Sequence, residues 1–334
     1  AGIITMKRSE ILARCLVIIA TLSMLVIPPA VRWFNNRQAV ELHARIAETG
    51  GWTPESISAQ VGAPLHLRLT SDDVIHGFAV GKLDGPAVDV EPGKVTSLTL
   101  NFDKPGKYTF YCTRWCGLNH WRMRGTIDVT GDGTLDPQPA PAPLYMALYL
   151  DLDAPHPAAV IPVVKPSAVR GKDLANAHPI IRYLIPDYYR SHSPAQVYLD
   201  LRADPSLTTL KDPQVWDLVA YIWQQNTTPA ELADGRQLFA RNCAACHGET
   251  AAGNGVFADD LAQFDTLGAS DRNRPVDFTN PITMLGTSPA LLQGKIVRGG
   301  MGTGMPMWGS IFSDDQIWSV ISYLYSYHFE ESIK

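Results

Sequence analysis

The sequence predicts a multidomain protein with one N-terminal transmembrane helix, a β-sandwich and a C-terminal all-α part. Three observations predict this order: an uncharged stretch at 15–31, short strand-like runs within 50–130, and helix-capping sequences after residue 143. The 334 residues suffice for two or three domains, each with its own core. The 28 basic and 33 acidic side chains give a net charge of −5, which excludes a protein that coats nucleic acid.

The uncharged stretch at 15–31, together with the apolar residues before it, is long enough to cross a bilayer. Arg14 would reach the membrane interface with its long side chain, and Trp33 and Phe34 would anchor the far end. A cleaved signal peptide is the alternative. We expect residues 1–49 to hold a retained transmembrane anchor and a connecting helix.

Residues 50–130 contain four runs of alternating or continuous apolar residues, separated by turn sequences that include two Pro-Gly pairs. These runs lie at 65–70, 74–80, 95–102 and 107–112. Such a succession of short strands is typical of a β-sandwich.

The fourth run leads into YCTRWCGLNHWRM, which carries Cys112, Cys116, His120 and Met123 on one loop. Thiolate, imidazole and thioether ligands together favour copper over magnesium or calcium, and tetrahedral zinc rarely binds methionine. His76, in DVIHGF, would supply a second imidazole from a separate strand. A Cys112–Cys116 disulfide and a mononuclear blue-copper site, which needs only one cysteine, are the alternatives.

The segment DVIHGFAV, followed by C-x3-C-x3-H-x2-M, resembles the dinuclear copper A domain of haem-copper oxidase subunit II. Across residues 10–130 the resemblance is closest to the B-type oxidases, whose subunit II has a single anchor helix, and the implied fold is cupredoxin-like. It implies six copper ligands: bridging Cys112 and Cys116, terminal His76 and His120, and weak axial ligands in Met123 and the backbone carbonyl of Arg114. Many family members have a carboxylate or an amide where this chain has Arg114.

A Gly/Pro-rich spacer at 131–143 marks a domain boundary. Further on, TPAE at 228–231 predicts a helix start with a capping box. That helix leads to Cys243, Cys246 and His247 in the sequence CAACH. C-x2-C-H is the attachment sequence for c-type haem, with the histidine as proximal ligand, and a thioredoxin-like pair is the alternative.

The sixth ligand of such a haem is expected from GGMGTGMPMWG, which contains Met301, Met305 and Met307. Its Gly-Met-Pro-x-Trp order resembles class I cytochromes c, in which the methionine before the proline binds iron. The resemblance implies Met305 as ligand, with Met307 as the alternative. Trp308 and Phe278 are expected to line the haem pocket.

Residues 144–227 parallel the haem-binding part in two places. The matching segments are 193–201 with 288–296, and 212–223 with 314–325. The first copy has no C-x2-C-H and no methionine loop. We therefore expect two tandem cytochrome c folds, without haem at 144–227 and with one haem at 228–334.

The two resemblances imply dinuclear copper A and one covalently bound haem c as cofactors. They imply an electron-entry subunit II, without catalytic residues of its own, in a membrane haem-copper terminal oxidase. Electrons would pass from a cytochrome c, a cupredoxin or a quinol-oxidising complex through haem c to copper A. They would then reach a polytopic haem-copper catalytic subunit that reduces oxygen to water.

The implied location is the cytoplasmic membrane of a prokaryote. One helix would lie in the lipid, with the N-terminus cytoplasmic and the C-terminal domains periplasmic, because covalent haem is attached outside that membrane. One alternative is the same relay in a copper-A-dependent nitric oxide reductase. The other is a stand-alone, membrane-tethered electron-transfer or copper protein.

Overall fold

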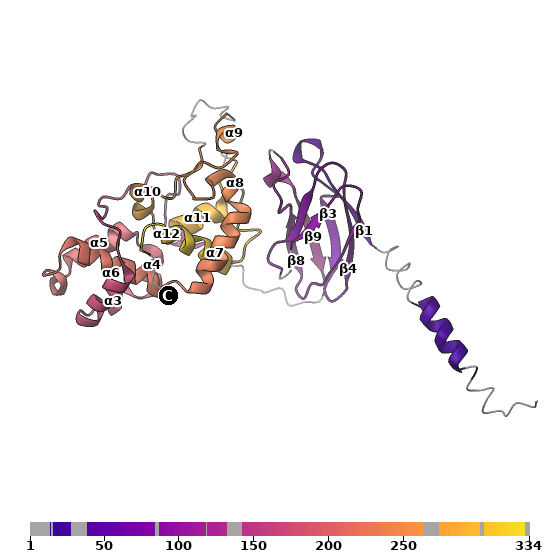
Figure 1. The fold of residues 1–334 in the computed structure, drawn as a ribbon, viewed down its shortest axis with the longest axis horizontal. Helices are drawn as coiled ribbons and strands as arrows, with labels where there is room; N and C mark the ends of the chain where they lie inside the picture. The colour runs from indigo at the N-terminus through magenta and orange to yellow at the C-terminus, as the bar shows by residue number, and fades with distance from the viewer. Residues whose placement is uncertain are drawn as a thin grey trace, which may run out of the picture.

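The computed structural model describes residues 14, 16–27, 39–83, 87–117, 119–131, 142–263, 274–300 and 304–330. A β-sandwich and a helical part lie side by side, and a short helix precedes the sandwich (Figure 1). That helix covers 16–27, and its apolar side chains are exposed. Among the described residues, no helix has both the length and the apolar character needed to span a bilayer. The remainder of the predicted span lies outside the described residues, so the anchor stays a prediction.

The sandwich consists of two sheets, with strand orders β2-β1-β4-β7 and β3-β9-β8-β5-β6. β1 pairs in parallel with β4, β3 pairs in parallel with β9, and the other pairings are antiparallel. The strands are β1 Val40–Ala44, β2 Trp52–Thr53, β3 Ser56–Gln60, β4 Leu65–Ser71, β5 His76–Val80, β6 Val88–Val90, β7 Thr96–Leu100, β8 Gly106–Tyr111 and β9 Arg124–Thr130.

Both sheets contribute to one core. Along β4 every second residue is buried, as expected for a strand with one face towards the core. Trp52 is packed edge-on against Phe78 and Phe110, with ring centroids 5.5 and 6.0 Å apart. The Trp52 indole N–H also donates to the backbone carbonyl of Met123, at 3.2 Å. The core therefore fixes the end of the loop that carries the predicted copper ligands.

The secondary structure at the start of the sandwich differs from the sequence-based prediction. Residues 40–49 were expected to belong to a connecting helix, but 40–44 form β1 and 47–49 form a single 3-10 turn. Val40, Leu42 and Ala44 alternate with polar residues, and the last two are fully buried. Burial of this face against β4 decides the conformation.

The helical part contains eleven helices of four residues or more among the residues that the structure describes there. They are α2 Leu144–Ala147, α3 Ala168–Ala177, α4 Pro186–Ser191, α5 Pro194–Ala203, α6 Asp212–Gln225, α7 Pro229–Asn242, α8 Ala244–His247, α9 Ala258–Gln263, α10 Pro281–Gly286, α11 Pro289–Arg298 and α12 Asp314–Ser326. The helix start predicted at 228–231 is confirmed, since Thr228 forms a capping box, and Ser193 and Ser313 form capping boxes as well. A cupredoxin-like sandwich followed by a helical, cytochrome c-like part is thus the observed architecture.

Two helix pairs cross in the same manner. In the pair α3–α6, a β-carbon added to Gly171 would lie 2.0 Å from the carbonyl oxygen of Asp217. In the pair α7–α12, a β-carbon on Gly235 would lie 2.0 Å from the carbonyl oxygen of Ser319. Only glycine permits this approach of two helix backbones. Asp217 and Ser319 occupy equivalent positions in the parallel segments 212–223 and 314–325.

Candidate metal and haem sites

The two loop cysteines lie at the edge of the sandwich beyond β8. Their Sγ atoms are 3.8 Å apart, and both thiols are free. A disulfide requires about 2.05 Å between the sulfurs, so the structure has no Cys112–Cys116 bridge. At this separation one metal ion can bind both sulfur atoms, each at about 2.3 Å.

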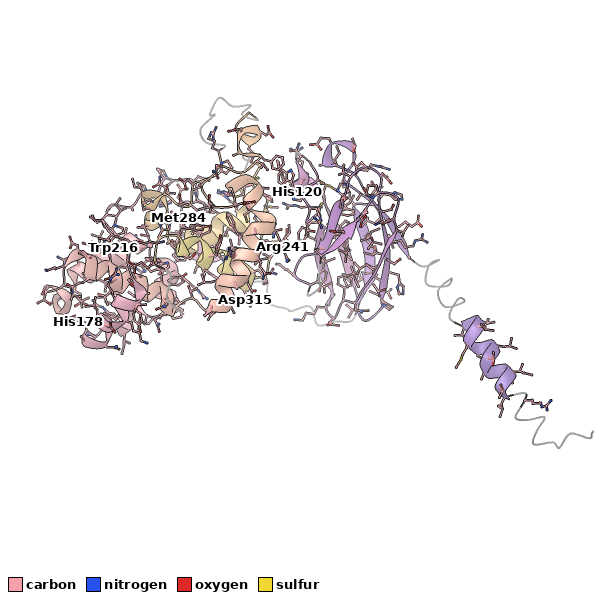
Figure 2. All side chains as sticks on the ribbon, viewed as in Figure 1. His120, His178, Trp216, Arg241, Met284 and Asp315 are labelled. Atoms are coloured by element: carbon pink, nitrogen blue, oxygen red, sulfur yellow. The ribbon has the colours of Figure 1, made fainter. Side chains whose placement is uncertain are left out.

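One imidazole faces each thiol. His76, the first residue of β5, is fully buried, and its Nδ1 lies 3.9 Å from Cys112 Sγ. His120, in the short 3-10 turn His120–Arg122, has its Nδ1 4.0 Å from Cys116 Sγ. Figure 2 shows His120 on the side of the sandwich that faces the helical part. Strand and loop thus bring together ligands that are 36 and 4 residues apart in sequence.

The two predicted axial groups also lie at this cluster. Met123 is buried, and its Sδ lies 3.2 Å from Cys116 Sγ. The carbonyl oxygen of Arg114 lies 3.1 Å from Cys112 Sγ. The Arg114 guanidinium points elsewhere, forming a two-pronged ion pair with Asp89 at 2.7 and 2.6 Å. The Arg114 side chain therefore points away from the cluster, and only its backbone carbonyl faces the cluster.

Asp73 orients the buried histidine, a role the sequence alone did not reveal. Its Oδ1 accepts a hydrogen bond from His76 Nε2 at 2.7 Å, which leaves Nδ1 with its lone pair towards the thiols. Burial alone would lower the pKa of His76, but the hydrogen bonds with Cys112 and Asp73 raise it. The signal was present in sequence as an acidic residue three positions before the ligand.

The thiol pair favours loss of one proton. The hydrogen bond with Cys116 lowers the pKa of Cys112 to about 3, although burial opposes this shift. The same contact, assisted by burial, raises the pKa of Cys116. A soft metal ion that displaces the remaining proton would turn both into thiolates.

The donor set fits copper. His76, Cys112 and Cys116 have ligand atoms within 4.8 Å of one another, and His120 and Met123 complete a set of two sulfur anions, two imidazoles and one thioether. Two thiolates exceed what a single blue-copper ion requires, so the set matches two copper ions better than one.

The C-x2-C-H sequence forms the short helix α8 directly after α7. Burial raises the pKa of the Cys243 thiol to about 12 and that of Cys246 to about 11. The chain then folds back, because the Gly253 N–H donates to the His247 carbonyl at 2.8 Å and the Gly255 N–H to that of Cys246 at 3.1 Å. These bonds hold the turn in one shape.

His247 has the tautomer that an iron ligand needs. Its Nδ1 lies 3.2 Å from the carbonyl oxygen of Val276, which can only accept, so Nδ1 carries the proton and Nε2 keeps its lone pair. Burial lowers the pKa of His247, which favours the neutral imidazole. The Phe278 ring centroid is 4.7 Å away, where the sequence predicted a pocket wall.

The candidate sixth ligands differ in environment. Met305 is partly buried and packs against the core of the helical part. The side chain of Met307 is 57% exposed, and Met301 lies outside the described residues. Of the two methionines that the structure describes in this loop, Met305 is therefore the one packed against the core.

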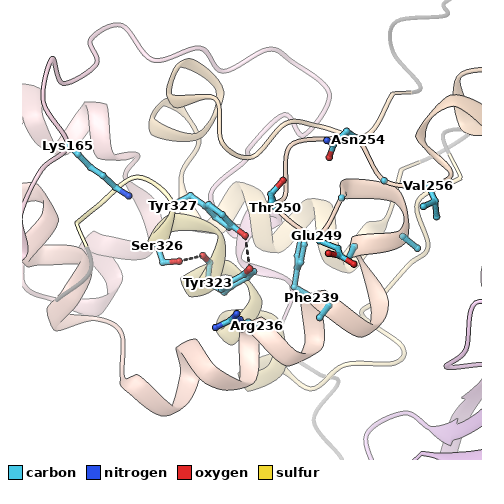
Figure 3. Close-up of a pocket in the computed structure, with 15 residues that line it drawn as sticks. Lys165, Arg236, Phe239, Glu249, Thr250, Asn254, Val256, Tyr323, Ser326 and Tyr327 are labelled. Carbon is cyan, nitrogen blue, oxygen red and sulfur yellow. Dashed lines mark hydrogen bonds between the residues drawn. The ribbon is translucent and has the colours of Figure 1, made fainter. Parts of the chain in front are cut away.

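A groove of about 800 Å³ lies on the outer side of the same turn (Figure 3). It is lined by Ala244 and Ala245 of α8, by Tyr323 of α12 and by Tyr327, which directly follows α12. The hydroxyls of the two tyrosines are 2.6 Å apart. The predicted haem ligands do not line it.

The fold is a cupredoxin-like β-sandwich joined to a helical, cytochrome c-like part, and comparison with known families agrees. Residues 53–130 match the model of the cytochrome c oxidase subunit II periplasmic domain. Residues 230–324 match the model of the cbb3-type cytochrome c oxidase subunit III. The predicted resemblance to an oxidase subunit II joined to a cytochrome c domain is confirmed.

Curated relatives match part of the chain. The chain is 42% identical over 81 residues to a cytochrome c oxidase subunit 2 of Thermus thermophilus, covering 24% of this chain and 58% of the relative. It is 44% identical over 67 residues to cytochrome c oxidase subunit 2 of Apis florea, covering 20% of this chain and 29% of the relative. The chain thus spans less than two thirds of these relatives.

Two solved structures show the same pattern of partial similarity. A chain from the cryo-EM structure of a haem-copper terminal oxidase dimer is 24% identical, with a TM-score of 0.25, and covers 37% of this chain and 100% of its own length. The periplasmic domain of cytochrome oxidase subunit II of Bradyrhizobium japonicum is 20% identical, with a TM-score of 0.24, covering 28% of this chain and 85% of its own length.

Proposed function

We propose that this chain is the electron-entry subunit II of a membrane haem-copper terminal oxidase. The observation that carries the proposal is the convergence of His76, Cys112, Cys116, His120 and Met123 at one edge of the sandwich, beside a second domain with a C-x2-C-H turn. Such a ligand set suits electron relay, because the chain offers no second open metal site for substrate chemistry among its described residues.

In the copper centre, Cys112 and Cys116 would bridge two ions, and His76 and His120 would each bind one. Met123 and the Arg114 carbonyl would be weak axial ligands. When bound, the two copper ions would supply one-electron transfer, held by these residues with little rearrangement of the protein. Asp73 would hold His76 in its ligating tautomer.

In the haem domain, Cys243 and Cys246 would attach the porphyrin through thioethers. His247 Nε2 would bind the iron from one side, while its Nδ1–H stays on the Val276 carbonyl. Met305 would bind from the other side, since Met307 is largely exposed. The two sites give a chain with dinuclear copper A and one haem c.

Residues 144–227 would be a haemless copy of the cytochrome c fold. The glycine-mediated crossings of α3 on α6 and of α7 on α12 support this assignment. So do the matching serine caps, Ser193 before α5 and Ser288 before α11.

Electrons would enter the haem from an external donor and leave from copper to a polytopic catalytic subunit. The anchor would place both domains on the periplasmic side of a prokaryotic cytoplasmic membrane. Oxygen uptake by the native, detergent-extracted complex, fed by a reduced small cytochrome, tests this proposal. Fast, cyanide-sensitive uptake supports it, whereas prompt haem reduction with no oxygen consumed contradicts it and makes nitric oxide the acceptor to test next.

The variant Cys116→Ser should abolish the mixed-valence copper spectrum and stop electron exit, because one bridging thiolate is lost. The haem should remain reducible by an external donor. Absorption spectra recorded before and after reduction check both outcomes. Undiminished turnover in this variant would mean that electrons do not leave through copper.

A further inference from the structure

The loops that carry the two sites meet across the interface between the sandwich and the helical part. The backbone N–H of Lys82 donates to the carbonyl of Ile311 at 3.1 Å, and Arg124 Nη1 donates to the carbonyl of Met307 at 3.3 Å. In Figure 1, α7 and α8 lie on the side of the helical part that faces the sandwich. The copper loop and the haem turn are therefore on facing surfaces.

A pair of stacked aromatic rings joins these surfaces. The ring centroids of Trp115 and Phe257 are 3.7 Å apart, with an angle of 23° between the ring planes. Trp115 lies between the two bridging cysteines in sequence, and its ring is 4.9 Å from that of His120. One partner of the stack thus contacts a predicted copper ligand.

The other ring of the stack, Phe257, is held against the C-x2-C-H turn. The backbone N–H of Phe257 donates to the carbonyl of Ala245, which lies between Cys243 and Cys246, at 3.1 Å. Two residues earlier, a β-carbon on Gly255 would lie 2.4 Å from the same carbonyl, so the loop is pressed onto the turn. Phe257 is therefore one hydrogen bond away from the backbone that attaches the haem.

We propose that the Trp115–Phe257 stack positions the two sites and bridges them for electron transfer. This inference rests on the proposed function. One electron would leave the ferrous haem iron, which becomes ferric, and enter the mixed-valence copper pair, which becomes fully cuprous. No bond is made or broken, and no proton moves.

Trp121 offers a second contact between the copper loop and the helical part. A β-carbon on Gly304, next to Met305, would lie 3.3 Å from Cζ2 of Trp121. Trp121 and Trp115 have the same side chain, lie on the same loop and both face the helical part. Their ring centroids are 6.3 Å apart. Only Trp115 is stacked on a residue that is hydrogen-bonded between the two haem cysteines, so we assign the bridge to Trp115.

The contribution of Trp115 comes from its ring rather than its polar atom. The indole N–H is buried and has no hydrogen-bond partner among the described residues. Phenylalanine at this position would keep an aromatic ring against Phe257 and remove an unsatisfied donor. Trp115→Phe is therefore the conservative variant that should preserve the bridge, and Trp115→Leu the one that should break it.

The test uses the full chain with both cofactors in the purified complex. A ruthenium photoreductant reduces the haem in a flash, and absorbance follows the electron from haem to copper. We expect Trp115→Leu and Phe257→Leu to slow this step by about tenfold or more. Each variant loses an aromatic pair that favours contact between the two domains by up to about tenfold, and it leaves a gap where the rings were stacked. Trp115→Phe should restore the rate, and the matched control Trp121→Leu should slow it far less.

Each variant must first show the mixed-valence copper spectrum and a reducible haem, so that loss of a site is not mistaken for loss of the bridge. The phenylalanine on the other domain keeps the test open if Trp115→Leu fails to load copper. Equal rates in Trp115→Leu, Phe257→Leu and the unmodified chain would overturn the inference, as would a larger loss in Trp121→Leu. Absence of both spectra from the unmodified chain would instead refute the proposed function.

Discussion

Residues 144–227 and 228–330 each cross two helices at a glycine, yet only the second region has the residues to bind a haem. In both regions the glycine packs on a helix carbonyl and lies beside a tyrosine, Tyr221 in one and Tyr323 in the other. The shared crossing and the unshared C-x2-C-H turn show that this helix packing does not require a C-x2-C-H sequence.

The first region fills its core with aromatic side chains instead. Tyr198 is stacked on Trp216 with ring centroids 4.6 Å apart, and Tyr189 meets Trp223 edge-on at 5.2 Å. All four are buried. Burial of such large rings supplies the hydrophobic stabilisation that the second region would gain from a porphyrin.

The largest expected effect concerns haem content. The double variant Cys243→Ala, Cys246→Ala should lose all covalent haem, while the unmodified chain should hold one haem per chain. Haem staining of a denaturing gel and iron analysis check the prediction. Two haems per chain in the unmodified protein would refute a haemless first region.

A smaller change is expected when only the sixth ligand is lost. Met305→Ala should keep the covalent haem but lower its reduction potential, because a thioether ligand favours ferrous iron. The absorption band near the red end of the oxidised spectrum should disappear as well. Met307→Ala is the matched control, since this side chain is mostly exposed, and loss of the band there would assign the ligand to Met307.

Alanine at the two helix crossings should affect the two regions separately. Overpacking against a carbonyl 2.0 Å away costs about 3 kcal/mol or more, which exceeds the roughly 1 kcal/mol that alanine gains in helix propensity. Gly235→Ala should lower the urea concentration at which the haem absorption spectrum changes, whereas Gly171→Ala should lower the unfolding midpoint of the first region and leave that spectral transition in place. An identical shift of the haem spectral transition in both variants would show that the regions fold as one unit.

The smallest expected effect lies where the two regions meet. Glu330 pairs with Arg170 at 3.1 Å, and hydrogen bonding with Ser167 and then with Arg170 lowers the pKa of this carboxyl below its ordinary 4.5. The carboxylate therefore stabilises the fold above pH 4.5, and this contribution is lost as the pH falls through the lowered folded-state pKa. Glu330→Gln should be slightly less stable at pH 7 and equal to the unmodified chain at low pH, as measured by urea unfolding. A difference that persists at low pH would mean that charge is not its cause.

Local sequence signals predicted much of the fold. Serine and threonine caps with Gln or Glu three residues later marked the helix starts, because these pairs satisfy backbone N–H groups on the spot. β1 was missed, since its partner β4 is 27 residues away along the paired register, and burial against that partner overrides a weak local preference.

At the two candidate sites, too, features of local sequence were predictable and features set by tertiary packing were not. The copper-loop cluster was predictable because four side chains follow one another within twelve residues and their chemistry is distinctive. The groups that orient the two histidines outside this loop were not predicted. Asp73 orients His76, and the Val276 carbonyl orients His247. Nor did sequence pair Trp115 with Phe257, because only tertiary packing brings residues of two domains together.

The spacer at 131–143 has a consequence for kinetics. It joins the sandwich to residues 144–227, which continue into the predicted haem domain, so that haem and copper would be held at a high effective concentration, which for short tethers reaches the millimolar range. The proposed step from haem to copper would then be first order, independent of protein concentration. The stacked rings and the Lys82–Ile311 backbone hydrogen bond are not ion pairs, so raising the ionic strength should leave this step nearly unchanged. Salt should act instead on the encounter with the external donor.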